Sequence, residues 1–212
     1  MRRVIVVVVV LGCIALFACS TPRASVQSVS GTQPSVLDER SSPGARRLAL
    51  AAQSQVGKTV IYDAAYVKLK YPAGDVPMDR GVCTDVVVRA FRTLGVDLQV
   101  EVHKDMAADF KAYPQNWGLP GPDSNIDHRR VPNLRTYFTR KGKVVPASDN
   151  PADYWPGDLV TWEVLGRPHI GLVSTVIAPG GQRYCIVHNI GAGTQVEDRL
   201  FEFKITGHYR PL

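Results

Sequence analysis

The pattern of this chain changes near Val144, and that change does most to limit the fold. Before Val144, we predict four helices, at 43–56, 83–94, 105–113 and 132–141. After it, four β-rich runs are separated by turn residues such as Pro179, Gly180 and Gly181. Helices followed by strands indicate an α+β domain. We expect N-terminal helices packed on a C-terminal antiparallel sheet.

The second predicted helix begins at a cysteine, in the stretch GVCTDVVVRAF. Its apolar residues follow helical spacing and Gly95 ends it; the stripe comprises Cys83, Val86, Val87, Ala90, Phe91 and Leu94. Cys83 therefore lies in the first turn, where unpaired N–H groups and the helix dipole favour a thiolate. The alternative is that Cys83 is only a small buried apolar residue.

The first 19 residues have the pattern of an export signal. Arg2 and Arg3 precede an apolar run, and Leu16–Cys19 is typical of a lipoprotein box, so that Cys19 would be lipidated. A competing box ends at Cys13, and ordinary cleavage or an uncleaved anchor are further alternatives. Each route exports the protein. We expect a periplasmic protein held to the membrane by a lipid anchor.

Residues 20–45 are rich in Ser, Pro, Gly, Thr and Gln and lack apolar periodicity, which predicts a flexible tether. Residues 46–212 then suit one domain with its own core. The net charge of +6 is spread along the chain, and no nucleic-acid-binding module is recognisable. We expect a monomer that binds peptidoglycan or another peptide substrate of the cell envelope and does not bind nucleic acid.

The predicted domain contains two cysteines, Cys83 and Cys185. In an exported protein they could form a disulfide, which is the main alternative to a reactive Cys83. No Cys-x-x-Cys or His-x-x-x-His pair indicates zinc. A metal held by Cys83, His169 and His188 stays a minor alternative, and we expect no metal and no cofactor.

Two histidines lie on predicted strands that a Pro-Gly-Gly turn would join as a hairpin. Strand alternation places His169 on one face with Gly171, and His188 on one face with Ile186. A thiolate, an imidazole and a group that orients the imidazole make a nucleophilic site. Cys83, His169 and His188 could supply all three. If His188 faces the Cys83 helix, Cys185 points away from it, so the disulfide and the triad exclude each other.

Two further features bear on this site: the carboxylate of Asp85 and a loop before the fourth predicted helix. Asp85 beside the thiol would raise its pKa unless it turns away or Arg89 neutralises it. The stretch IDHRRVPN before the fourth helix is predicted as a specificity loop in which arginines bind substrate carboxylates and Asp127 orients a neighbour. A solvated, self-paired loop is an equal alternative. The candidate substrate contacts are Thr84, Asp127, His128 and Arg129.

A cysteine at a helix start, followed by GDLV, HIGLV and IVHN, resembles the NlpC-type cell-wall peptidases of the papain-like superfamily. The resemblance implies a papain-like fold with Cys83 as nucleophile, His169 as base and His188 as orienter. It also implies a tyrosine near the oxyanion hole, at Tyr71, with Tyr62 as a rival. Asn189 would replace His188 if the strand register slipped by one residue.

The stretches YPAGDVP, GVCTDVVVRAFR, NIDHRRVPNL and KITGHYRP resemble an uncharacterised family of exported bacterial proteins within that superfamily, over about 48–211. Two features depart from the usual NlpC-type pattern: Val82-Cys83-Thr84-Asp85 at the nucleophile, and a long spacing between the two histidines. We therefore expect a thiol hydrolase acting on amides of peptidoglycan stem peptides. An acyl or peptidyl transferase and a non-catalytic peptide-binding module are the alternatives.

Overall fold

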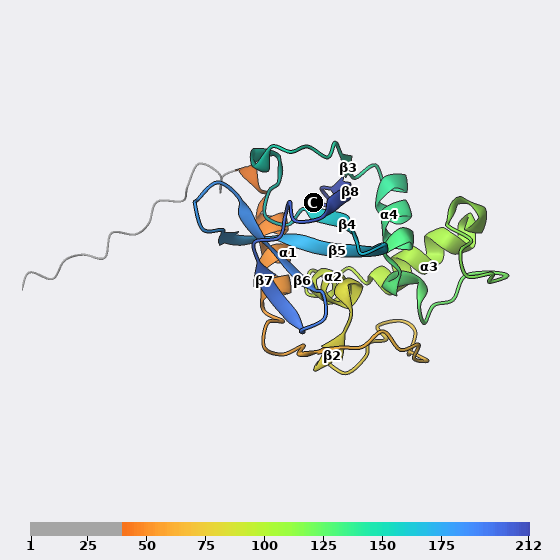
Figure 1. Cartoon of the computed structure of the whole chain (residues 1–212). Coiled ribbons are helices and arrows are strands. Elements are labelled where there is room, and N and C mark those ends of the chain that lie inside the picture. Colours follow the sequence, from red (N-terminus) through yellow and green to blue (C-terminus); the bar gives the residue numbers. More distant parts are fainter. Residues whose placement is uncertain (1–39) are drawn as a thin grey trace, which may run out of the picture. The chain divides into compact units, whose positions relative to one another are not determined.

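A computed structural model describes residues 40–212, and this part of the chain has a mixed α/β fold built on an antiparallel sheet (Figure 1). The expected signal, tether and lipidation site at Cys19 lie outside the described residues, except for the last few residues of the tether. The helices are α1 (Pro43–Gln53), α2 (Cys83–Arg92), α3 (Leu98–Ala108) and α4 (Val131–Arg140). No helix among the described residues is long and apolar enough to cross a membrane.

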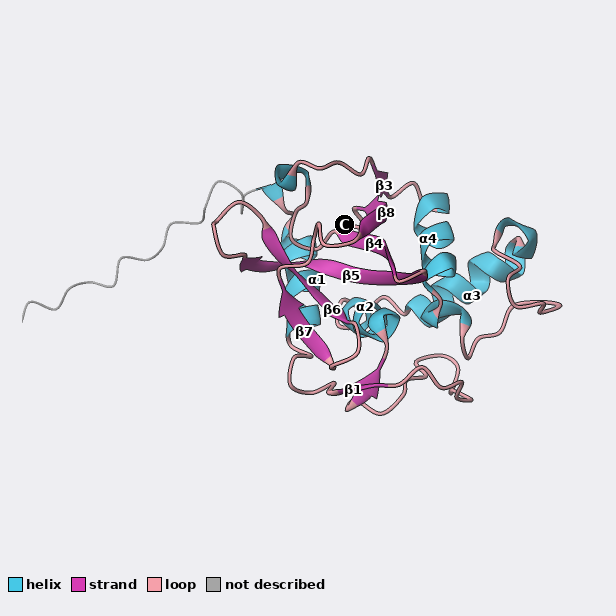
Figure 2. Ribbon diagram, in the orientation of Figure 1, coloured by secondary structure: helices cyan, strands magenta, loops and turns pink. Residues whose placement is uncertain are grey.

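The six-stranded sheet has the order β3-β8-β4-β5-β6-β7, and every neighbouring pair is antiparallel (Figure 2). Its strands are β3 (Val144–Val145), β4 (Leu159–Val164), β5 (Arg167–Ile177), β6 (Tyr184–Asn189), β7 (Thr194–Glu197) and β8 (Lys204–Tyr209). The expected β5–β6 hairpin is confirmed. Two short parallel strands, β1 (Ile61–Tyr62) and β2 (Arg80–Gly81), lie just ahead of α2 in the chain.

The helices cover one face of this sheet. Leu48 of α1 and Val87 of α2 are fully buried against Ile170 and Leu172 of β5 and Val187 of β6. The other face carries a smaller core of Val160, Trp162, Val173, Tyr184, Ile186 and Leu200 with Tyr154. The expected packing of the Cys83 helix on the sheet is confirmed.

Helix ends follow local chemistry. Ser42 caps α1 by accepting a hydrogen bond from the Ala45 N–H, and Pro43 occupies the first turn, as predicted. After α2, Gly95 has a φ of +82°, and the N–H of Val96 bonds back to the carbonyl of Phe91. Gly95 therefore closes α2 with the left-handed turn that glycine adopts at low cost.

The predicted helix at 105–113 is wrong in its position. The helix α3 begins at Leu98, where the Asp97 side chain accepts a hydrogen bond from the Gln99 N–H, and only a 3-10 turn covers 110–112. Leu98, Val102 and Met106 repeat every four residues and form its buried stripe. Strand β7 was also not predicted.

Candidate functional site

Cys83 is the first residue of α2, and its side chain is buried. The backbone N–H groups of Ile170, Thr84 and Cys83 itself are directed at the sulfur and act to lower its pKa. Burial acts in the opposite direction and dominates, so the pKa of the Cys83 thiol is raised to about 11. The thiol is therefore neutral at pH 7 in a site that already holds donors for its anion.

A cavity of about 200 Å³ opens beside Cys83. Most of its wall is apolar or aromatic, and two arginines also contribute; the lining residues are Tyr62, Ala64, Val82, Cys83, Trp117, Ile126, Arg129, Arg130, Val131, Pro132 and Pro168. A mostly apolar hollow with a few polar groups is the usual form of a small-ligand site. The cysteine therefore lies at a cavity large enough for about one amino-acid residue.

The two predicted histidines contact each other in a chain of hydrogen bonds. His169 Nε2 lies 2.8 Å from His188 Nδ1, and His188 Nε2 lies 3.0 Å from Glu197 Oε2. Arg199 holds the other oxygen of Glu197 at 3.1 Å. Both imidazoles are buried, whereas Glu197 is partly exposed. Glu197 was not predicted as part of the site.

This chain fixes the tautomers of both rings. The Glu197 carboxylate can only accept, so His188 donates from Nε2 and its Nδ1 carries a lone pair. That lone pair accepts the Nε2 proton of His169, which leaves Nδ1 of His169 unprotonated. Burial, and to a lesser extent the adjacent His188, lowers the pKa of His169 to about 3. Both imidazoles are therefore neutral, and the free nitrogen of His169 can take a proton.

The expected relation between His188 and the Cys83 helix is corrected. Val187 packs in the core with α2, and Ile186 packs in the core on the opposite face, so His188 lies with Ile186, away from α2. His169 bonds to His188 and packs against Trp162 of the same core, so its side chain lies on that face too. The Cys83 sulfur instead contacts the backbone of β5, where it accepts the N–H of Ile170, the residue after His169. The alternative of a disulfide between Cys83 and Cys185 is wrong, because both cysteines are free.

Gly171 allows the two strands to approach. A Cβ at Gly171 would lie 2.7 Å from Ile186 Cγ2 and 3.1 Å from His188 Cβ. Distances that short force neighbouring atoms to move, so a side chain here would push the histidine-bearing strand away. Gly171, two residues after His169, therefore allows the contact between the two imidazoles.

Asp85 is neutralised, but by Arg129 and not by Arg89. Arg129 donates to both carboxylate oxygens of Asp85 at 2.8 and 2.9 Å, and both side chains are almost fully buried. Asp85 Oδ2 also accepts the Val82 N–H at 2.7 Å, which fixes the start of α2. The remaining donors of Arg129 bond to the carbonyls of Asp63 and Ala65. Arg129 is thus occupied inside the protein, and the expectation that it binds substrate is not supported.

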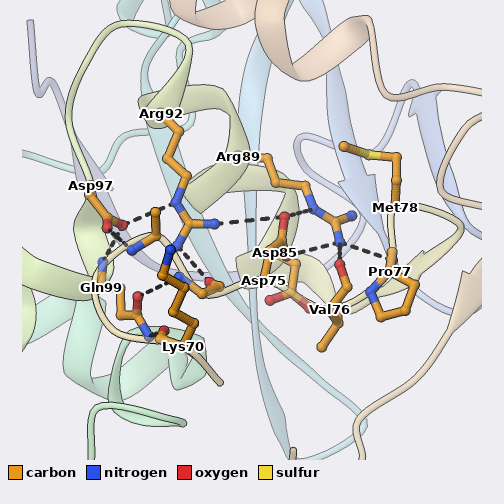
Figure 3. A network of polar contacts seen from close by, with 12 residues as sticks. Lys70, Asp75, Val76, Pro77, Met78, Asp85, Arg89, Arg92, Asp97 and Gln99 are labelled. Carbon is orange, nitrogen blue, oxygen red and sulfur yellow. Dashed lines mark hydrogen bonds and ion pairs between the residues drawn. The ribbon is translucent and has the colours of Figure 1, made fainter. Parts of the chain in front are cut away.

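Arg89 has a different task. It donates to Asp75 at 2.8 and 3.0 Å, and its guanidinium also reaches the carbonyls of Val76 and Pro77 (Figure 3). One turn later, Arg92 bonds to Asp97 and to the carbonyl of Gly74. The two arginines of α2 therefore fasten the loop at 74–80 that leads into Cys83.

The other predicted residues are placed as follows. Tyr71 stacks edge-on against His103 and is absent from the lining of the Cys83 cavity, whereas its rival Tyr62 is one of the lining residues. Thr84 donates its hydroxyl to the Arg129 carbonyl. Asn189 donates to the Gly81 carbonyl at 3.0 Å from the α2 side of the sheet, so it does not orient His169.

Asp127 and His128 lie in a 3-10 turn ahead of α4 and are buried. Asp127 accepts hydrogen bonds from the Asp123 N–H and from Arg130, so it does orient a neighbour. Burial lowers the pKa of His128 to about 4, and its Nδ1 has no hydrogen-bond partner within residues 40–212. Neither residue lines the Cys83 cavity.

Sequence reasoning missed Trp117 at the cavity as well as Glu197, whereas Arg130 belongs to the loop whose arginines were expected to bind substrate carboxylates. Trp117 comes from the long proline-rich loop, and Arg130 precedes α4. Within the described residues, no group of three or more His, Cys, Asp or Glu side chains is arranged to hold a metal ion.

A cysteine at the start of a helix, with its sulfur at the backbone of the strand that carries one of two hydrogen-bonded histidines, defines a thiol-containing α/β protein. The chain belongs to the family described as Domain of unknown function (DUF1287), whose model matches residues 49–211. It is 56% identical over 164 residues to the uncharacterized protein YijF of Escherichia coli K12, covering 77% of this chain and 80% of that protein.

A solved structure, that of NlpC1 from Trichomonas vaginalis, is similar at a TM-score of 0.42 and 11% identity. The alignment covers 78% of this chain and 43% of that one, so this chain spans less than half of its length.

Proposed function

We propose that the protein is an exported thiol hydrolase with a papain-like, NlpC-like fold, in which Cys83 attacks an amide carbonyl and His169 is the base. Two observations carry the proposal: the hydrogen-bonded chain from Glu197 through His188 to His169, and the backbone N–H of Ile170, the residue after His169, which is directed at the Cys83 sulfur beside a cavity. A carboxylate that sets the tautomer of a base is the arrangement that nucleophilic hydrolases need. Peptidoglycan stem peptides are the proposed substrate, because the N-terminal export pattern directs the protein to the cell envelope.

In the first step, the thiol proton moves to Nδ1 of His169 as the sulfur bonds to the substrate carbonyl carbon. The charge that develops on the carbonyl oxygen needs N–H donors, which the first turn of α2 provides. The amide bond then breaks, and His169 gives its proton to the leaving amine. Water releases the acyl group from Cys83 in the same way, with His169 again taking the proton.

The raised pKa of Cys83 decides between two forms of this chemistry. A thiol with a pKa of about 11 and an imidazole with a pKa of about 3 do not form a stable ion pair at pH 7. His169 therefore acts as a general base during attack and does not keep a thiolate in the resting protein. The same two shifts also favour the second candidate, a module that binds a peptide in the cavity without cleaving it.

Alkylation of Cys83 by iodoacetamide, followed by intact-protein mass spectrometry between pH 6 and 11, separates the two. For a hydrolase, His169→Ala slows alkylation at pH 7 at least tenfold, the lower end of what general-base assistance contributes to a rate. Near pH 11 the variant and the parent converge, because the thiol ionises without help. Equal rates at pH 7 would overturn the hydrolase and leave the binding module. Digestion of purified peptidoglycan then tests the substrate.

A further inference from the structure

The Cys83 cavity is lined by an arginine, Arg130, whose hydrogen-bonding edge is open. Arg130 lines the cavity, and its guanidinium carbon lies 3.9 Å from the centroid of the Trp117 ring. A single hydrogen bond of 3.3 Å joins one of its amino groups to Asp127. Within residues 40–212, its Nε and its other amino group have no hydrogen-bond partner. The side chain is 16% exposed, so solvent reaches it.

The neighbouring arginine shows the contrast. Arg129 lines the same cavity, but Asp85 and two backbone carbonyls occupy its guanidinium, and it is 2% exposed. Among the described residues that line the cavity, no acidic side chain is present to take the free edge of Arg130. Of the two arginines at the cavity in the described part of the chain, Arg130 is therefore the one with donors to spare.

The position of Arg130 is also fixed in advance. Stacking on Trp117 holds the plane of the guanidinium, and Asp127 holds one of its corners. Asp127 is itself buried and accepts the Asp123 N–H, so this corner is anchored to the loop. A planar, pre-oriented guanidinium with two free donors matches a carboxylate, which accepts two parallel hydrogen bonds.

We propose that Arg130 is the binding residue for a substrate carboxylate within about one residue of the amide bond that Cys83 attacks. The proposal rests on the hydrolase function and deepens it by naming an acidic peptide as the substrate class. The limit of one residue follows from the cavity of about 200 Å³ that Cys83 and Arg130 share. The carboxylate belongs to an acidic side chain or to the end of a peptide.

Matched alkylating reagents test the proposal without a known substrate. N-iodoacetylglycine and N-iodoacetylglycinamide differ only in a carboxylate against a carboxamide. In both, the Cys83 sulfur bonds to the methylene carbon, iodide leaves with the bonding pair, and the thiol proton passes to the base. The measurement is the acid-to-amide ratio of alkylation rates at pH 8 on the full protein, compared with the same ratio for glutathione.

We expect the ratio to exceed that of glutathione at least tenfold, which corresponds to one charge-assisted hydrogen-bonded pair. Arg130→Gln should return it to the glutathione value, and Arg130→Lys should restore only part, because an ammonium lacks the fork. Arg47→Gln, at an exposed arginine of α1, is the control for lost charge and should keep the ratio. A parent ratio equal to that of glutathione, or one that survives Arg130→Gln, overturns the proposal.

Failure of the hydrolase would look different, since both reagents would then react at rates that do not depend on His169. The carboxylate site is in that case judged by binding alone. Titration with N-acetylglycine, and not with N-acetylglycinamide, should shift the Nε–H signal of Arg130 in NMR spectra of the full protein. Absence of that shift overturns the site whatever the fate of the hydrolase.

Two peptides distinguish the sources of the carboxylate. One carries an internal Glu and a C-terminal amide, and the other carries Gln at the same place and a free C-terminus. Their binding to a Cys83→Ala variant is measured by calorimetry. Tighter binding of the first assigns an acidic side chain, and tighter binding of the second assigns a chain end. If Arg130→Gln weakens the binding of both peptides equally, Arg130 binds a carboxylate from either source. If it weakens the binding of neither, the proposal is contradicted.

Discussion

Glu197 holds His188 from the side opposite to His169, with its Oε2 atom 3.0 Å from His188 Nε2. The carboxylate comes from β7, an edge strand, and it sets which nitrogen of each imidazole carries a proton. It touches neither the thiol nor the cavity, so it acts through the two rings as a positioning residue. Because Glu197 is farthest from the thiol in this hydrogen-bonded series, we expect it to contribute less to the reactivity of Cys83 than His169 does.

Substitution of Glu197 should make His169 a weaker base but should not abolish its action. In Glu197→Ala the rings are free to adopt the tautomer that protonates Nδ1 of His169, which cannot accept the thiol proton. We expect alkylation of Cys83 at pH 7 to slow about threefold, less than the tenfold or more expected for His169→Ala. The pH profile separates this role from a structural one, because the two proteins should again converge near pH 11, where Cys83 ionises by itself.

Glu163→Ala is the matched control, because Glu163 is an exposed carboxylate on β4, a strand of the same sheet that does not touch β7. It should leave the profile unchanged. If Glu197→Ala shifted the whole profile by the same factor at every pH, the effect would be on packing, and the assigned tautomers would be wrong.

The buried pair of Asp85 and Arg129 should matter for stability more than for reactivity. Asp85→Asn leaves the Arg129 guanidinium buried without its counter-charge, and such a loss destabilises a protein by roughly 3–5 kcal/mol. Denaturant unfolding at pH 7 measures it. Adding Arg129→Met to Asp85→Asn should recover part of the loss, because the buried charge is then gone as well.

Arg183→Met is the comparison for that pair, because Arg183 binds Asp198 on a partly exposed surface. Its cost should stay within about 1 kcal/mol. If Asp85→Asn cost no more than this, the pair would be better solvated than its burial indicates.

Tyr62 should affect Cys83, and Tyr71 should not. Tyr62 lines the cavity, and burial together with the nearby thiol raises its pKa, so its hydroxyl stays protonated and can donate. We expect Tyr62→Phe to change the rate of Cys83 alkylation several-fold at pH 8. Tyr71→Phe is the matched control and should give the parent rate, since Tyr71 packs on His103. An effect of Tyr71 equal to that of Tyr62 would restore the assignment made from spacing.

The sequence predicted the elements that carry strong periodicity. The stripe from Cys83 to Leu94 and the strand runs around His169 and His188 were confirmed because their apolar runs are long enough to identify a helix and two strands, although α2 and β6 are buried on all sides. The position of α3 was missed because the predicted helix was placed directly before Pro114, whereas α3 already ends at Ala108. The helix in fact begins at Leu98, where the Asp97 side chain accepts a hydrogen bond from the Gln99 N–H. Asp97 was not identified as a helix cap from the sequence.

The candidate site was predictable only where residues share a strand or a turn. His169 and His188 could be matched through alternation and the hairpin. Glu197 could not, because β7 is four residues long and carries no periodic pattern. Arg129 and Arg130 are adjacent and chemically identical, and only tertiary packing sends the first to Asp85 and the second to Trp117.

The buried histidines make the protein sensitive to acid, and His128 offers the cleanest test. Its pKa is lowered to about 4 by burial, from an ordinary value of 6.5. Above pH 6.5 it is neutral in both the folded and the unfolded chain. As the pH falls from 6.5 toward 4, the unfolded chain takes up a proton that the folded protein does not. The free energy of unfolding therefore decreases over this window.

Substitution by a neutral residue should remove the contribution of this one group. His128→Gln should lose less stability than the parent between pH 6.5 and pH 4, by about 3 kcal/mol for a shift of this size. Urea unfolding at several pH values measures the difference, and each protein serves as its own reference at pH 7, where no proton is taken up. His169 and His188, whose pKa values are also lowered, continue to weaken both proteins in acid. If the two curves ran parallel from pH 7 to pH 4, His128 would be protonated in the folded protein, and its partnerless Nδ1 would have found an acceptor.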